Sequence, residues 1–252
     1  MNTLTGKVVA IHQPNFLPWL GYFDKMDRCD IFILLDRVQF VHSSAINRVK
    51  ILSNEKPQFI TAPIHHTGTL DMEIGEVKID HSQKFLRKVT GTLFQNYSKQ
   101  PYWKQYGEPV IEIINRRQEY LVDLNVELIK FLAKSLGISW DKVRMQSDLT
   151  FRGQKSELIS TLVKAAGGNI YLSGGMDPGN TPTGQKTGTA ADYNDPAVYS
   201  AYGIILEYQN FVHPEYDQGL GQFFPGLSSF DALTRFGERT IELMRACNNQ
   251  NR

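Results

Sequence analysis

The fold is decided by residues 7–36, KVVAIHQPNFLPWLGYFDKMDRCDIFILLD. This stretch holds two short apolar runs, one ending at His12 and the other at Asp36. Two prolines exclude a helix just after the first run, and a short helix is expected from about residue 19 to 28. A strand, a helix and a second strand imply a crossover connection. The two strands are therefore predicted to be buried and parallel.

The rest of the chain continues the mixture of strands and helices. Period-3.6 apolar patterns predict a block of helices from about residue 82 to 137. We therefore expect an α/β protein with a Rossmann-like, mostly parallel sheet and an inserted helical block, in a single domain over residues 1–252. Further strands are expected at 57–64, 73–79, 142–147, 169–172 and 203–210, and helices at 82–97, 103–117, 120–136, 156–166 and from Ser228 or Ser229 to about 247.

A long segment from Ser173 to Pro196 is rich in Gly, Pro, Thr and Asn. A loop of that length in a compact domain is usually functional or disordered, and we expect a lid over a binding site. Within it, residues 179–187 resemble a phosphate-binding P-loop, but one extra residue precedes the lysine and no helical pattern follows. We therefore expect no Walker-type nucleotide site.

Composition narrows the class of protein. The chain has 27 basic and 26 acidic side chains, a net charge of +1, which gives no overall field for nucleic acid or an anionic membrane. No apolar run is long enough to span a membrane, and the start of the chain does not look like a signal peptide. Cys29 and Cys247 lack metal-binding spacing and are expected to be buried free thiols, with a disulfide as the alternative. These features favour a cytoplasmic protein without membrane insertion.

Polar side chains cluster after the two predicted strands. Ligands in open α/β sheets bind beyond the carboxyl ends of the strands, and an imidazole, a carboxylate, amides and a guanidinium all follow these two. They give acid/base, amide and anion-binding chemistry at one rim. The alternative is that they satisfy turns and cap loops. The candidates are His12, Gln13, Asn15, Asp36, Gln39, Asn47 and Arg48.

The same residues lie in a longer pattern that resembles the WbqC-like family of bacterial surface-polysaccharide proteins. The pattern is HQPNFLPWLGYF at 12–23, CDIFILLD at 29–36, VQF at 38–40 and NR at 47–48, with later matches at 97, 101–103, 171–174, 211–216 and 227–231. Residues 175–194 look longer and richer in Gly and Thr than the family pattern. The resemblance implies a place in O-antigen or lipopolysaccharide assembly. It suggests transfer of an acyl or aminoacyl group to the amine of a nucleotide-linked amino sugar.

Such a transferase must take a proton from the attacking amine and stabilise an oxyanion. His12 is the candidate base, with Asp36 as the second choice, and Asn15, Gln39 or Asn47 are candidate oxyanion donors. Arg48 and Lys155 are expected to hold the diphosphate. Gln13, Ser173 and Gly174 complete the predicted substrate contacts.

We expect no bound cofactor and no metal, because His65 and His66 are adjacent and lack a third ligand at suitable spacing. The acyl donor would be a coenzyme A thioester, a carrier-protein thioester or a charged tRNA, the last disfavoured by the near-zero net charge. The rival hypothesis is a non-catalytic protein that binds nucleotide sugars or assists assembly. The sequence leaves the oligomeric state open.

Overall fold

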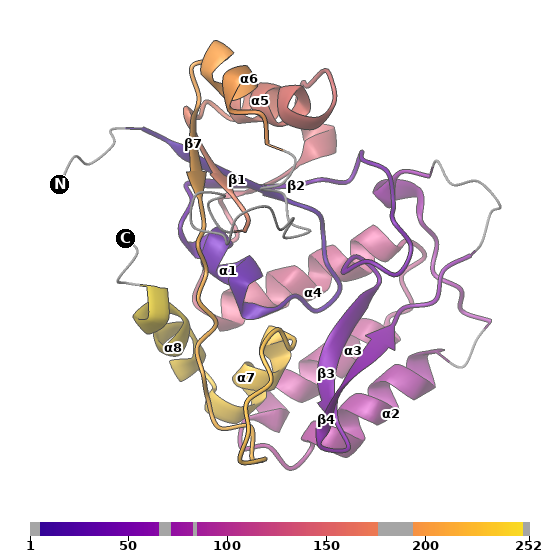
Figure 1. Ribbon diagram of the computed structural model, residues 1–252. Helices are drawn as coiled ribbons and strands as arrows, with labels where there is room; N and C mark the ends of the chain where they lie inside the picture. The colour runs from indigo at the N-terminus through magenta and orange to yellow at the C-terminus, as the bar shows by residue number, and fades with distance from the viewer. Residues whose placement is uncertain (1–5, 66–71, 83–84, 176–193, 249–252) are drawn as a thin grey trace.

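The computed structural model describes residues 6–65, 72–82, 85–175 and 194–248 (Figure 1). Its centre is a five-stranded sheet in the order β5-β2-β1-β6-β7, in which every pair of neighbours is parallel. The Rossmann-like α/β prediction is therefore confirmed. The strands are β1 (Val8–His12), β2 (Ile31–Leu34), β5 (Val143–Met145), β6 (Ile170–Ser173) and β7 (Ile205–Tyr208).

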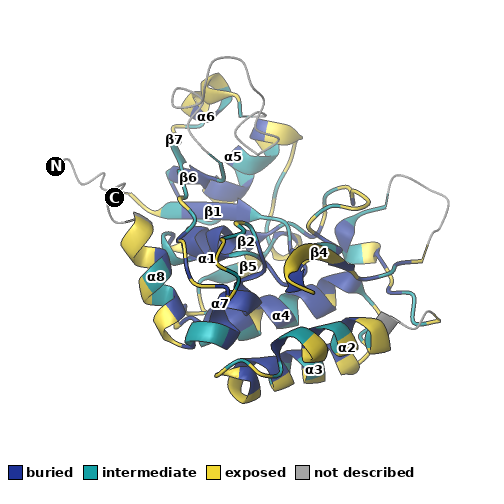
Figure 2. Ribbon diagram, turned by 60° about the horizontal axis from the view of Figure 1, so that its bottom comes forward, coloured by how far each residue is buried: buried dark blue, intermediate teal, exposed yellow. Residues whose placement is uncertain are grey.

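Successive residues of β1 belong to two different hydrophobic core clusters, one on each face of the sheet. Ala10 lies in the larger core cluster, with α1 (Leu20–Asp27), α4 (Leu121–Ser135) and α7 (Ser229–Phe236). Val9 and Ile11 lie in the smaller one, with α5 (Lys155–Ala165) and α6 (Pro196–Ala201). Successive side chains of a strand point to opposite faces, so both faces of β1 are covered. Figure 2 shows this strand dark blue at the centre of the molecule.

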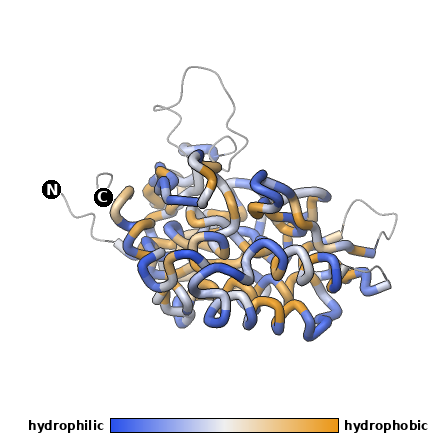
Figure 3. The backbone as a smooth tube through the Cα atoms, turned by 90° about the horizontal axis from the view of Figure 1, so that it is seen from below, coloured by the Kyte–Doolittle hydropathy of each residue, from blue (hydrophilic) through white to orange (hydrophobic). Residues whose placement is uncertain are grey.

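The helical block lies beside the sheet. It consists of α2 (Phe85–Tyr97), a π-helical turn η2 (Trp103–Gly107), α3 (Glu108–Asn115) and α4. A separate antiparallel hairpin, β3 (Arg48–Ser53) and β4 (Lys56–Thr61), packs near α2. The outer faces of α2 and α3 are exposed (Figure 2). Blue and orange alternate along much of the tube in Figure 3, the pattern expected of amphipathic elements.

Several predicted elements differ from the structure. The stretch predicted as a strand at 73–79 instead has a 3₁₀ turn, η1 (Ile74–Glu76), flanked by isolated β-bridges at Glu73, Lys78 and Ile79. The predicted strand at 142–147 ends early in another 3₁₀ turn, η3 (Gln146–Asp148). The single C-terminal helix is interrupted after α7 by Gly237, whose φ of 57° ends that helix, and α8 (Arg239–Asn248) follows. The prediction at 103–117 missed the π-helical turn η2, and both β3 and α6 were missed.

Both cysteines are free, as predicted, but only Cys29 is buried. Cys247 is exposed on α8, which corrects the expectation of two buried thiols. No helix in the described part of the chain is long and apolar enough to cross a membrane.

Candidate functional site

The switch point of the sheet lies between β1 and β6. The chain runs from β1 to β2 and β5 on one side, and then returns to β6 and β7 on the other side of β1. In an open parallel sheet, connections that diverge in this way leave a crevice at the carboxyl ends of the two central strands. His12 ends β1 and Ser173 ends β6. The structure therefore brings these two predicted site residues to the place where ligands bind in such folds.

His12 is held in one tautomer. Its Nδ1 lies 3.1 Å from the carbonyl oxygen of Gln13, and because a carbonyl accepts but cannot donate, Nδ1 carries the hydrogen. Nε2 is then the nitrogen able to accept a proton. Burial and, to a smaller extent, the nearby Lys25 ammonium together lower the pKa of His12 to about 3, against the opposing effect of the bond to Gln13. The imidazole is therefore neutral at physiological pH.

Lys25 is a site residue that the sequence analysis missed. Its side chain is 1% exposed, and its Nζ donates a 2.7 Å hydrogen bond to the carbonyl oxygen of Ile11. A Cβ placed on Gly174 would lie 3.5 Å from the same Nζ, so the ammonium reaches from β1 to the end of β6. No described carboxylate forms a salt bridge with it. Burial lowers the pKa of Lys25 to about 7.

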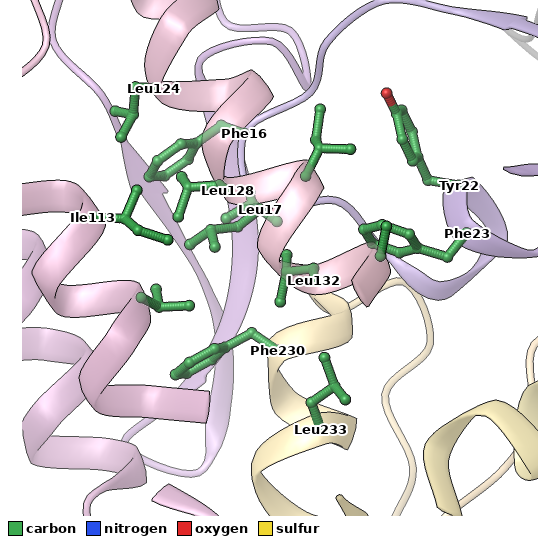
Figure 4. Packing of buried hydrophobic residues seen from close by; sticks show 14 of the residues in the cluster. Phe16, Leu17, Tyr22, Phe23, Ile113, Leu124, Leu128, Leu132, Phe230 and Leu233 are labelled. Atoms are coloured by element: carbon green, nitrogen blue, oxygen red, sulfur yellow. The ribbon is translucent and has the colours of Figure 1, made fainter. Parts of the chain in front are cut away.

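Tyr22 lies on the same face of α1 as Lys25, three residues earlier. Its ring centroid is 4.6 Å from that of His12. The side chain is 1% exposed, and its hydroxyl has no hydrogen-bond partner among the described residues. Figure 4 shows this hydroxyl directed away from the rest of the labelled core cluster. Burial keeps the phenol protonated by raising its pKa well above the usual value.

At the end of β6, the hydroxyl of Ser173 belongs to a polar network. Asn194 Nδ2 donates to Ser173 Oγ at 2.9 Å, and the Tyr199 hydroxyl donates to Asn194 Oδ1 at 2.9 Å. Ser173 is itself fully buried. Ser173 Oγ in turn donates to the carbonyl oxygen of Gly174 at 3.3 Å, so the network fixes the strand end at the position where Gly174 lies beside Lys25.

Asp36 is engaged in holding loops together. Its Oδ1 accepts a 3.0 Å hydrogen bond from the amide of Ser147, and its carbonyl oxygen accepts one of 2.8 Å from the amide of Gly75. The side chain is 7% exposed. This geometry matches the loop-capping alternative considered from the sequence, and it leaves the carboxylate poorly placed to act as a base at the switch point.

Asn47 also has structural partners. Its Nδ2 donates to the carbonyl oxygen of Ala62 at 3.3 Å, and its carbonyl oxygen accepts from the amide of the same residue at 2.7 Å. These bonds close the open end of the β3–β4 hairpin. Asn47 is buried there, which separates it from the oxyanion role considered for it.

Arg48 and Asn15 lie together, but in a cavity of their own. The cavity has a volume of about 290 Å³ and lies between the segment after β1 and the hairpin. Its lining comprises Asn15, Phe16, Pro18, Trp19, Ser43, Ala45, Arg48, Val49, Lys50, Phe59 and Gly226. We call it the hairpin cavity.

The remaining predicted contacts lie elsewhere. Gln39 is exposed and forms a backbone bridge with Glu73. Lys155 is exposed at the first position of α5, with a φ of 50°, and does not line the hairpin cavity with Arg48. Gln13 is half-buried beside His12. Most of the predicted lid, residues 176–193, lies outside the described residues, and so does the P-loop-like stretch.

Over the described ranges, no three His, Cys, Asp or Glu side chains gather closely enough to hold a metal ion. His65 lies at the edge of a described range, and His66 lies outside it.

Comparison with known proteins supports the resemblance seen in the sequence. The description "WbqC-like protein family" matches residues 13–243, a range that begins just after β1 and covers the other four strands of the sheet, the helical block and the hairpin cavity. The chain belongs to the WbqC-like family. This WbqC-like protein is also 27% identical over 243 residues to the uncharacterized protein Rv1507c of Mycobacterium tuberculosis, an alignment that covers 96% of this chain and 99% of that protein. No solved structure matches it significantly.

Proposed function

We propose that this WbqC-like protein transfers an acyl or aminoacyl group to the amino group of a nucleotide-linked amino sugar, in the cytoplasm, during assembly of a bacterial surface glycan such as O-antigen. The observation that carries the proposal is the pair of His12 and Lys25 at the switch point. Burial lowers the pKa values of both groups, to about 3 and about 7. Two nitrogen bases that are wholly or partly unprotonated at neutral pH therefore lie together where α/β folds bind ligands.

The chemistry requires a base of this kind. The sugar amine attacks the carbonyl carbon of a thioester or ester, the new C–N bond forms, and the tetrahedral intermediate carries an oxyanion and an ammonium. The base takes one proton from that ammonium, the C–S or C–O bond breaks, and the proton passes to the departing thiolate or alkoxide. Positioned bases in such steps contribute about 10²–10⁴-fold to the rate.

Lys25 suits this role better than Asp36. A lysine whose pKa lies near the working pH combines a substantial unprotonated fraction with useful basicity. The tautomer of His12 leaves Nε2 free to accept a proton, but with lower basicity. The Tyr22 hydroxyl is protonated and unpartnered among the described residues, so it is a suitable donor to the oxyanion.

The test is turnover with the purified protein. Nucleotide-linked amino sugars would be incubated with radiolabelled acyl-coenzyme A, acyl carrier protein or aminoacyl-tRNA, and acylated sugar would be detected by mass. We expect one donor class to give product, and Lys25→Met and His12→Asn each to reduce it. Tight binding of the nucleotide sugar without transfer from any donor would reject catalysis and favour a binding or assembly protein.

A further inference from the structure

The hairpin cavity has a strongly positive lining. Arg48 and Lys50 line it, and its eleven lining residues include no Asp or Glu. Neither cation forms a salt bridge or side-chain hydrogen bond with any residue in the described ranges. A guanidinium and an ammonium that face a cavity without a protein counter-ion are suited to an anionic ligand.

The two cations flank one aromatic ring. Phe59 of β4 is 51% exposed, and it lies directly opposite Lys50 of β3 in the hairpin register. The guanidinium carbon of Arg48 is 4.3 Å from the centroid of the Phe59 ring, and Lys50 Nζ is 5.5 Å from it. These contacts orient both long side chains at the cavity. An exposed aromatic ring at this position offers a flat surface on which a ligand ring can stack.

Trp19 supplies a second aromatic side chain on the other wall. Its indole is fixed by an edge contact with Phe211, with ring centroids 5.3 Å apart, and by a stacked contact with His213 at 6.2 Å. Aromatic walls with a few polar groups are typical of small-molecule sites. The volume of about 290 Å³ is close to the lower limit, about 300 Å³, of such sites. It suits one part of a larger ligand.

The cavity is also close to the switch point along the chain. Asn15 lines the cavity and His12 ends β1, three residues earlier. Three residues of fully extended chain span at most about 11 Å. The wall of the cavity at Asn15 therefore lies within about 11 Å of His12, a distance that one extended ligand can span.

We propose that the hairpin cavity binds a nucleoside diphosphate, with Arg48 and Lys50 on the diphosphate and with Phe59 and Trp19 beside the base. The choice of a nucleotide rests on the proposed function. The same chemical group occurs in two substrates of that reaction, the nucleotide sugar and coenzyme A. Lys155, which was expected to share the diphosphate with Arg48, has no part in this site.

The test is calorimetric titration of the full-length protein with ADP, UDP, inorganic pyrophosphate and uridine. Arg48→Gln and Lys50→Gln should each weaken binding of the diphosphates about 10-fold or more, the loss expected for a charge-assisted contact, and should leave uridine unaffected. Phe59→Leu should weaken binding of the nucleotides more than binding of pyrophosphate. Lys56→Gln removes an exposed charge from the same hairpin, outside the cavity lining, and is the matched control.

The proposal is overturned if wild-type protein binds none of the diphosphates, or if Lys56→Gln weakens them as much as Lys50→Gln does. Two further ligands, coenzyme A and UDP-N-acetylglucosamine, show which of the two substrates the cavity binds. Preference for coenzyme A and ADP assigns the cavity to the acyl donor, and preference for UDP and UDP-N-acetylglucosamine assigns it to the sugar nucleotide. No acyl transfer occurs in this assay. The absence of binding would therefore refute the proposed nucleotide site in the hairpin cavity. Binding without turnover in the earlier assay would refute the proposed transferase activity.

Discussion

The ammonium group of Lys25 donates a 2.7 Å hydrogen bond to the carbonyl oxygen of Ile11, one residue before His12 ends β1. The bond fixes α1 against the strand that it follows, and it holds a cation at the centre of the sheet rim. Because Asp24, the adjacent carboxylate, is directed to Gln209 and Arg28, the ammonium is left without an acidic partner in the described structure. The buried charge is therefore destabilising, and Lys25 loses its proton at a lower pH than an ordinary lysine does.

Lys25 should make the stability of the protein depend on pH. The pKa is about 7 in the folded protein, below the ordinary value of 10.5. Between those values the unfolded chain keeps the proton and the folded protein does not. Unfolding then takes up a proton, so stability rises with pH across this window. We expect the free energy of unfolding of wild type, minus that of Lys25→Met, to rise by up to about 1.4 kcal/mol per pH unit.

Urea unfolding at pH 7, 8 and 9 measures this difference. Lys56→Met, which removes an exposed ammonium from the hairpin, is the control and should retain the wild-type pH dependence. A difference between wild type and Lys25→Met that does not change with pH would show that Lys25 stays charged throughout the range.

The same pKa predicts the pH profile of acyl transfer. If the unprotonated amine of Lys25 is the base, kcat should rise with pH and reach half its maximum near pH 7. Lys25→Met should remove that inflection and lower kcat by about 10²–10⁴-fold. The comparison with Lys25→Met on the same acceptor is essential, since the sugar amine also titrates. An inflection near pH 7 that survives in the variant belongs to the acceptor.

Asp36 provides a direct test of the structural role assigned to its carboxylate. Asp36→Asn keeps an oxygen that accepts the bond from the Ser147 amide, whereas Asp36→Ala removes it. We expect Asp36→Asn to leave the free energy of unfolding and kcat close to wild type, and Asp36→Ala to lose about 1–3 kcal/mol of stability. Loss of turnover in a well-folded Asp36→Asn protein would instead support the catalytic role inferred from the sequence.

The sequence was sufficient to predict those parts of the fold that depend on the local pattern of apolar and polar residues. The apolar runs around Val9 and Ile33 identify β1 and β2, and the crossover between them implies parallel pairing, as observed. The apolar run before His12 also predicts that this residue lies at the carboxyl end of β1, as observed. In contrast, Asp24 and Lys25 are adjacent charged residues in a short helix, a pattern that in a sequence is typical of a solvated face. Their burial depends on residues that follow β6 and β7, such as Gly174 and Gln209, which no local pattern reveals.

The hairpin was missed for a different reason. Arg48 to Ser53 does alternate, but the turn that follows is Asn54-Glu55, with φ values of 50° and 61°. Two positive φ values in a two-residue turn normally call for Asn-Gly, so the turn was not recognised. As a result, Arg48 was placed at the rim of the main sheet. The i, i+2 spacing of Arg48 and Lys50, which puts both cations on one face of a strand, was the signal available.

Asn125 should be essential to the stability of the segment that joins the two sites. It is fully buried in α4, and its Nδ2 donates 2.8 Å bonds to the carbonyl oxygens of both Pro14 and Ile46. Asn125→Ala would leave two buried acceptors without a donor, at about 1–3 kcal/mol each. We expect a loss of about 2–6 kcal/mol in the free energy of unfolding, measured with urea. Asn115→Ala, at an exposed position on α3, should change it by less than about 0.5 kcal/mol.

The His12→Asn variant tests whether His12 has a catalytic or a structural role. The histidine makes one side-chain hydrogen bond among the described residues, from Nδ1 to the carbonyl oxygen of Gln13, and the Asn amide can donate the same bond. The variant should therefore fold with a melting temperature close to wild type. It cannot accept a proton as imidazole does, so a direct role in proton transfer predicts a fall of about 10²–10⁴-fold in kcat with little change in substrate affinity.

The comparison with Lys25→Met decides which nitrogen is the base. If His12 is the base, its pKa of about 3 predicts that the Lys25→Met rate shows no inflection between pH 5 and 9 other than that of the acceptor amine, and that His12→Asn abolishes turnover. If Lys25 is the base, His12→Asn should retain the inflection near pH 7 at a reduced rate, because the neutral imidazole then orients the amine and does not deprotonate it. Near-normal kcat in both folded variants would place proton transfer outside the switch point.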